Sequence, residues 1–78
     1  MPSARSDPNE RLRNLLRDLR VAKGLRQVDV AERLREPQSF VSKYESGERR
    51  LDFTEVAAVC EALGVSLAEL VRRFEENA

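Results

Sequence analysis

Apolar residues recur along this chain at helical spacing, in five short blocks separated by glycine, proline or helix-capping residues. In the first block, four leucines fall within an arc of roughly 100° on a helical wheel, namely Leu12, Leu15, Leu16 and Leu19. A strand would need apolar and polar residues in alternation, and the sequence contains no such run. The pattern therefore predicts an all-α chain that folds into a compact five-helix bundle.

Local signals mark where each helix begins and ends. In a capping box, a side-chain oxygen accepts the backbone N–H of the residue three positions later, and a glutamate there accepts the backbone N–H of the first residue. The sequence predicts such boxes at Asp7, Asp52 and Ser66. Glycines that follow the apolar blocks end helices, and Pro37 has to lie outside a helix interior. The expected helices span residues 8–23, about 27–34, 37 or 38 to 45, 53–63, and from 67 past 74.

The length and composition of the chain limit what it can be. Seventy-eight residues suffice for one domain with a small core, which we assign to residues 7–76, with residues 1–6 as a disordered tail. A single cysteine and the absence of histidine exclude an internal disulfide and an ordinary zinc site. No apolar run is long enough to cross a membrane, and no hydrophobic leader is visible, so we expect a cytoplasmic protein with no membrane partner.

Catalytic chemistry finds little support in the sequence. Cys60 is the only thiol, no histidine is present to activate it, and its apolar neighbours predict that it packs in the core. The sequence contains no glycine-rich phosphate loop and no cluster of metal-ligand residues. We therefore expect neither enzyme activity nor a metal or cofactor.

The charges cancel overall but are unevenly distributed. Residues 1–50 contain 12 lysines and arginines against 8 acidic residues, whereas residues 51–78 contain 2 against 6. Such an asymmetry indicates a surface that attracts a polyanion. The pI near 6.3 is lower than that of a strongly basic nucleic-acid-binding domain, so charge alone does not identify the partner.

The third predicted helix has two chemically different faces. Because successive residues turn by about 100°, one arc of roughly 140° carries an amide, two hydroxyls and an ammonium, from Gln38, Ser39, Ser42 and Lys43. In the major groove of DNA, a glutamine amide pairs with adenine and a lysine ammonium with guanine. The alternative interpretation is the solvated face of an ordinary surface helix.

Further polar residues flank this face at both ends. Arg26 and Gln27 stand at the start of the second helix, where backbone N–H groups and side chains can hold a phosphate. Arg49 and Arg50 follow the third helix, either as phosphate contacts or as an ordinary solvated pair. Together with the polar face, these residues favour a DNA interface.

Several longer motifs run through the chain, namely Leu16-Arg-Asp-Leu-Arg20, Gly24-Leu-Arg-Gln27, Val30-Ala31, Leu34, Val41-Ser-Lys-Tyr-Glu45, Gly47 and Ala62-Leu-Gly-Val-Ser66. Through them, residues 12–74 resemble the lambda-repressor-like helix-turn-helix domains of the Cro and phage-repressor type. The resemblance implies a helix-turn-helix at about residues 27–45 whose second helix reads DNA.

The resemblance also implies roles for individual residues. Gln38, Ser39 and Lys43 match the positions that contact bases. Gln27 matches a position that contacts phosphate and braces the reading helix, and Ser42 matches a contact to the DNA backbone or to a base. These five residues, with Arg26, Arg49 and Arg50 as further backbone contacts, make up the expected DNA-binding site.

Other positions agree with the family or depart from it. Arg20 and Glu45 match a structural ion pair between the first and third helices. Arg26 stands where a serine or threonine commonly caps the second helix. Arg35 stands where the turn often has glycine, so it must adopt a left-handed conformation or take a different turn. Glu36 brings a negative charge close to the expected DNA surface.

These observations predict a sequence-specific transcription regulator that binds double-stranded DNA, of repressor type. A homodimer would place two reading helices in major grooves about 34 Å apart on a palindromic operator. Leu70, Val71 and Phe74 are candidates for its interface, unless they close the core of the monomer. The alternative is a protein-interaction module such as an antitoxin or adaptor, with a toxin or the polymerase as partner.

Overall fold

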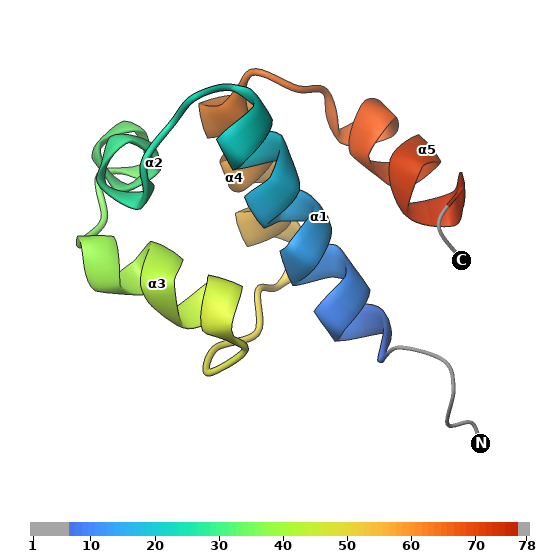
Figure 1. The fold of residues 1–78 in the computed structure, drawn as a ribbon, viewed down its shortest axis with the longest axis horizontal. Helices are drawn as coiled ribbons and strands as arrows, with labels where there is room; N and C mark the ends of the chain where they lie inside the picture. The colour runs from blue at the N-terminus through green and yellow to red at the C-terminus, as the bar shows by residue number, and fades with distance from the viewer. Residues whose placement is uncertain (1–6, 77–78) are drawn as a thin grey trace.

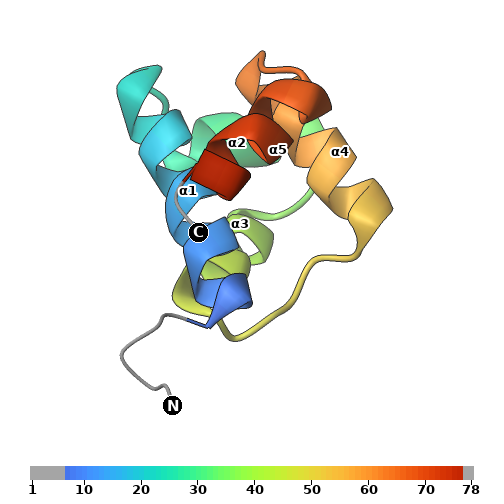
Figure 2. The same cartoon turned by 90° about the vertical axis from the view of Figure 1, so that its right-hand side faces the viewer.

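The computed structural model describes residues 7–76, and over that range it contains helices and no strand. Figure 1 shows the helices in chain order: α1 (Pro8–Ala22), α2 (Gln27–Leu34), α3 (Gln38–Ser46), α4 (Phe53–Leu63) and α5 (Leu67–Glu76). α1 and α4 form the middle of the bundle, with α2 and α3 on one side and α5 on the other. Figure 2 shows α5 lying over α1 and α4. The predicted five-helix bundle is confirmed, and the predicted tail lies outside the described residues.

The apolar blocks of all five helices meet in one core. Its buried members are Leu16, Leu19, Val30, Ala31, Val41, Tyr44, Val56, Val59, Cys60, Ala62, Leu63 and Leu70. Leu70 is 2% exposed, so it closes the core of the monomer, which is one of the two alternatives that the sequence left open for it. α5 attaches to the bundle by burying one stripe of side chains, and Leu70 lies in the middle of that stripe. Val71 is exposed and Phe74 half-buried.

The predicted capping boxes form to different degrees. At α4, Asp52 accepts a hydrogen bond from the backbone N–H of Glu55, and Glu55 accepts one from the backbone N–H of Asp52. At α5, Ser66 accepts from the backbone N–H of Glu69, but the Glu69 carboxylate pairs with arginines of its own helix instead. At α1 the prediction was wrong, since the Asp7 side chain makes no capping hydrogen bond. The proline that follows Asp7 starts the helix with a fixed φ and needs no partner for a first N–H.

The turn between α2 and α3 sets the angle of the helix-turn-helix. Arg35 has φ 60° and ψ 42°, so of the two alternatives that the sequence left open it adopts the left-handed conformation. The following residue, Glu36, then donates its backbone N–H to the carbonyl of Ala31, 3.0 Å away, which closes α2. Pro37 precedes the first residue of α3, where its missing N–H leaves no helical hydrogen bond unmade. α3 therefore departs sharply from the axis of α2.

Candidate nucleic-acid interface

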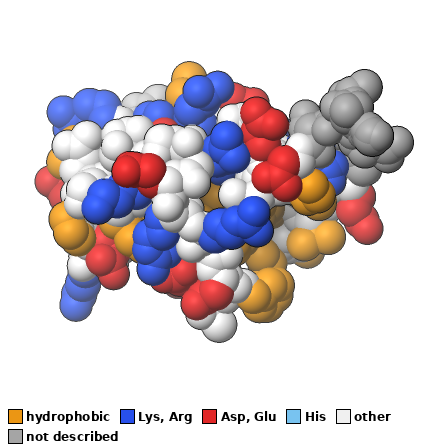
Figure 3. Space-filling view, turned by 90° about the horizontal axis from the view of Figure 1, so that it is seen from below, with side chains coloured by type: hydrophobic (Ala, Val, Ile, Leu, Met, Phe, Trp, Pro, Cys, Tyr) orange, Lys and Arg blue, Asp and Glu red, His pale blue; other side chains and the backbone are white. Residues whose placement is uncertain are grey.

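α3 separates its polar and apolar side chains as the sequence predicts. Val41 and Tyr44 are buried, and the ring of Phe40 packs edge-to-face on Tyr44 at a centroid distance of 5.7 Å. The predicted contact residues all lie on the exposed side, namely Gln38, Ser39, Ser42 and Lys43. Figure 3 views the molecule from the side on which α3 lies and shows lysine and arginine side chains spread over this face among uncharged and acidic ones.

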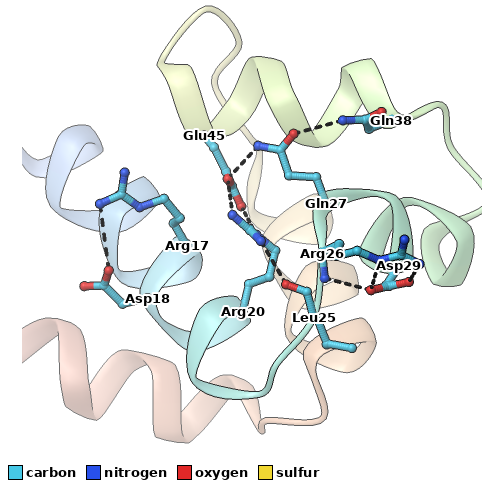
Figure 4. A network of polar contacts seen from close by, with 9 residues as sticks. All are labelled: Arg17, Asp18, Arg20, Leu25, Arg26, Gln27, Asp29, Gln38 and Glu45. Atoms are coloured by element: carbon cyan, nitrogen blue, oxygen red, sulfur yellow. Dashed lines mark hydrogen bonds and ion pairs between the residues drawn. The ribbon is translucent and has the colours of Figure 1, made fainter.

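A chain of hydrogen bonds links this face to the interior of the protein (Figure 4). Arg20 of α1 donates to both carboxylate oxygens of Glu45, over 2.7 and 3.0 Å. Glu45 also accepts from the side-chain Nε2 of Gln27, 2.9 Å away. Gln27 in turn accepts from Nε2 of Gln38 over 3.2 Å. Four residues from three helices thus form one polar network that ends at the first residue of α3.

The inner end of the network is well shielded from solvent. The side chains of Arg20 and Glu45 are only 13% and 5% exposed, as expected for a structural ion pair. Arg20 donates a further hydrogen bond to the carbonyl of Leu25 over 2.9 Å. The hydrogen bonds to Glu45 raise the pKa of Arg20, in spite of the opposing effect of burial. The pair fixes the end of α3 against α1.

Arg26 and Arg49, two of the expected phosphate contacts, already have carboxylate partners. The guanidinium of Arg26 pairs with Asp29, and Asp29 also accepts the backbone N–H of Arg26 over 2.7 Å. Arg49 makes two hydrogen bonds to Glu55 of α4, and its guanidinium lies 4.8 Å from the ring centroid of Phe40. Asp29 thereby makes the hydrogen bond of the third residue in a capping box, whereas Arg26 has no side-chain acceptor for the first N–H groups of α2. The spacing of the arginines alone does not predict these pairings.

Comparison with known proteins supports the resemblance. The helix-turn-helix family model matches residues 16–70, which is more than half of the chain. The chain belongs to the Cro/C1-type helix-turn-helix family. A comparison with curated proteins gives no match.

Solved structures of several family members are similar to this chain. An XRE-family like protein from Pseudomonas syringae pv. tomato str. DC3000 is 39% identical, with a TM-score of 0.85 over 91% of this chain and 87% of that chain. The clp gene regulator ClgR from C. glutamicum is 29% identical, with a TM-score of 0.82 over 94% and 95%. The restriction–modification controller protein C.Esp1396I, with its natural 35 base-pair operator, is 19% identical, with a TM-score of 0.85 over 92% and 95%. At that identity the last match shows the fold alone.

Arg13 lies beside the end of α3, and the sequence analysis did not identify it. The guanidinium of Arg13, on α1, packs against Gly47 just after α3, so close that a Cβ at position 47 would lie 3.0 Å from it. Gly47 has φ +91°, which glycine adopts without strain. Arg13 lies seven residues before Arg20, so both are on the same side of α1. Because Arg20 was expected to contact α3, this spacing could have identified Arg13 as a second residue that faces α3.

The remaining predictions concern chemistry outside this face. Cys60 is buried, and burial raises the pKa of its thiol. Within residues 7–76, no group of three or more histidine, cysteine or acidic residues is arranged to hold a metal ion. None of the described helices has both the length and the apolar character needed to span a bilayer.

A second surface feature lies away from α3, between α1, α4 and α5. This apolar hollow has a volume of about 380 Å³. Its walls are almost entirely apolar and include Leu12, Phe53, Val56, Leu67, Val71 and Phe74. Phe53 stands at its edge and is 70% exposed, an unusual exposure for so large an apolar side chain.

Proposed function

We propose that this protein is a DNA-binding transcription regulator that inserts α3 into the major groove of an operator and acts as a repressor-type homodimer. The two faces of α3 carry this proposal, because the back is fixed in the core by Val41 and Tyr44 while the front is polar and exposed. An α-helix fits the major groove, where each base pair presents a distinct set of donors and acceptors. Gln38, Ser39 and Lys43 are the residues to which we assign base contacts.

The phosphate contacts in this proposal come from the residues around α3. Gln27 and Ser42 can donate to phosphate oxygens, and Arg50 is exposed beside the end of α3. Arg26 and Arg49 would have to exchange or share their carboxylate partners with a phosphate. Exposed ion pairs contribute little to stability, so a phosphate can compete for these guanidinium groups.

Two similar proteins support the proposal that this chain is a DNA-binding regulator. One is described as a clp gene regulator, and the restriction–modification controller protein was solved as a tetramer in complex with its operator. Their matches cover 92% and 94% of this chain, in which we assign residues 7–76 to a single DNA-binding domain. A repressor needs only to occupy its operator, which a small domain with one reading helix per copy can do.

Selection from a random DNA pool, followed by a salt titration, tests DNA binding. We expect one palindromic sequence to be enriched, and its affinity to fall steeply with salt, with a slope of about −0.9 per phosphate contact. Transcription from a promoter that overlaps this sequence should decrease when the protein is added. A pool without enrichment, or an affinity that salt leaves unchanged, would refute the proposal and favour a protein-interaction module.

The apolar hollow is the surface that we assign to the homodimer. The exposed ring of Phe53 at its edge and the exposed Val71 are side chains that a second copy would cover. In a two-fold arrangement each chain offers the same patch to the other, so Phe53 of one copy can fill part of the hollow of its partner. α3 and α5 lie on opposite sides of the bundle, so this contact leaves both reading helices uncovered.

Sedimentation equilibrium of two matched variants tests this assignment. Phe53→Ser should weaken the dimer at least tenfold, because it removes a large apolar contact from the interface. Val21→Ser is the control, since Val21 is 60% exposed and does not line the hollow. Equal dissociation constants for both variants and for the unchanged protein would place the interface elsewhere.

A further inference from the structure

We infer that Glu55 is a positioning residue for DNA binding: it holds the guanidinium of Arg49 by one edge, so that a second edge is presented to a DNA phosphate. The inference rests on the proposed function, in which Arg49 contacts the DNA backbone. In this scheme the phosphate shares Arg49 with Glu55 and does not displace the carboxylate.

The guanidinium of Arg49 lies beside the reading helix. The backbone N–H of Arg49 donates to the carbonyl of Lys43 over 3.1 Å, so the segment after α3 turns back along this helix. The guanidinium then lies over the ring of Phe40, 4.8 Å from the ring centroid. Phe40 and Lys43 are three residues apart on α3 and are therefore neighbours on its surface. Arg49 is thus placed at the flank of α3, where the DNA backbone would pass a helix bound in the major groove.

The hydrogen bonds of Arg49 occupy one edge of its guanidinium. Nη1 and Nη2 donate to the two carboxylate oxygens of Glu55 over 3.0 and 2.7 Å, and Nη1 also donates to the carbonyl of Arg50 over 3.2 Å. A guanidinium carries five N–H groups in a fixed planar fork. The N–H of Nε and the second N–H of Nη2 form the other edge, and neither has a partner within residues 7–76. Two such parallel N–H groups match two oxygens of a phosphate.

Glu55 is itself held in place, so it can fix the orientation of Arg49. It belongs to the capping box of α4 and accepts the backbone N–H of Asp52 over 2.9 Å. The hydrogen bonds from Arg49 and from this N–H lower the pKa of Glu55 to about 2, so the carboxylate is charged at neutral pH. Immobilising a flexible side chain at an interface lowers affinity, and an arginine that is already held avoids much of this cost.

The negative charge of Glu55 also repels a phosphate, and this effect has the opposite sign. The guanidinium lies between the two anions, and the side chain of Arg49 is 41% exposed, so solvent and salt weaken the repulsion. We therefore expect positioning to outweigh repulsion at Arg49. Arg26 lacks the support of a ring and of a neighbouring carbonyl, because its side chain is 77% exposed and bonds only to Asp29 within the described residues.

A double-mutant cycle on operator affinity tests the role of Glu55. Glu55→Gln should weaken binding to the selected operator by roughly 2- to 13-fold, the ratio that corresponds to the ~0.5–1.5 kcal/mol cost of immobilising one side chain. In the Arg49→Met background the same change should have no effect, because no guanidinium remains to be positioned. A role for Glu55 only as the cap of α4 would weaken binding equally in both backgrounds, and this result would overturn the inference. Tighter binding by Glu55→Gln would overturn it too, since the phosphate would then displace the carboxylate.

Glu69→Gln is the matched control. It makes the same substitution at a glutamate that pairs with arginines, but on α5, which lies on the side of the bundle opposite to α3. The net charge changes by the same amount, and the affinity for the operator should not fall. A loss equal to that of Glu55→Gln would mean that the effect is not local to Arg49, and the inference would fail.

Arg49→Lys covers the case in which Glu55→Gln does not fold. It keeps the positive charge and leaves the capping box of α4 intact, but an ammonium is a point charge without a second planar edge. The affinity for the operator should fall by about as much as in Glu55→Gln. Full affinity in Arg49→Lys would show that the two-edged geometry is not used and would overturn the inference.

Arg49→Met by itself separates this inference from the proposed function. It should reduce the magnitude of the salt slope by about 0.9, the contribution of one phosphate contact. If it does so while Glu55→Gln leaves the affinity unchanged, the phosphate contact stands and the positioning role is wrong. If Arg49→Met leaves the salt slope unchanged, the phosphate contact is wrong and the inference fails with it, whereas DNA binding itself is judged by the enrichment of one sequence from the random pool.

Discussion

Replacing Arg20 with methionine should destabilise the protein by about 3 kcal/mol. The change removes two hydrogen bonds to Glu45 and one to the carbonyl of Leu25, and it leaves the 5%-exposed carboxylate without its counter-ion. Removing one partner of a buried ion pair costs about 3–5 kcal/mol. We expect the lower end, because Gln27 still donates to Glu45. For a chain of this size, 3 kcal/mol is a large part of a total of roughly 4–12 kcal/mol.

Urea denaturation measures this loss directly, and thermal melting should show a Tm lower by about 12–24 °C. The double variant Arg20→Met/Glu45→Leu serves as the control, because it removes both charges and leaves no unpaired carboxylate. It should lie within about 1–2 kcal/mol of the unchanged protein, since the Leu25 carbonyl still loses a donor. A single variant as stable as the unchanged protein, or a double variant no better than the single one, would refute the reasoning.

Three further predictions concern DNA affinity, strain and acid stability. Lys43→Ala should weaken binding to the selected operator by about 1–3 kcal/mol and relax one base preference. Arg50→Ala should instead weaken binding to all sequences alike and reduce the salt slope by about 1. A loss of affinity for only some sequences in Arg50→Ala would mean that the two residues have exchanged roles. Arg35→Gly should raise the free energy of unfolding in urea by about 0.5–1 kcal/mol, because φ 60° strains any residue with a Cβ, and a loss would contradict this. The hydrogen bonds from Arg49 and from the backbone N–H of Asp52 lower the pKa of Glu55 from 4.5 to about 2, so its stabilising effect is complete above pH 4.5 and is lost as the pH falls toward 2. Melting curves over this range should therefore show a smaller acid-induced loss for Glu55→Gln than for the unchanged protein, and parallel losses would count against the pairing.

The sequence alone determined the helices and the division of α3 into two faces. Both are local properties, since helical periodicity and the conformational limits of glycine and proline act over a few residues. At Arg35 the sequence left both a left-handed conformation and a different turn open, and the structure contains the left-handed one. Capping was predicted less well, because the Glu69 carboxylate bonds to arginines of α5 and the Asp7 side chain makes no capping hydrogen bond.

Only the tertiary structure decided which polar groups meet and which apolar groups stay exposed. Arg49 follows α3 and Glu55 belongs to α4. Nothing in their spacing predicts that the Glu55 carboxylate forms an ion pair with Arg49, which the sequence predicts to face DNA. Leu70 and Val71 are neighbours in a single apolar block, yet one is buried and the other exposed, because the burial of each depends on how α5 lies against α1 and α4. Hydrogen-bond partners and burial depend on distances between helices, and these are set by the packing of the whole core.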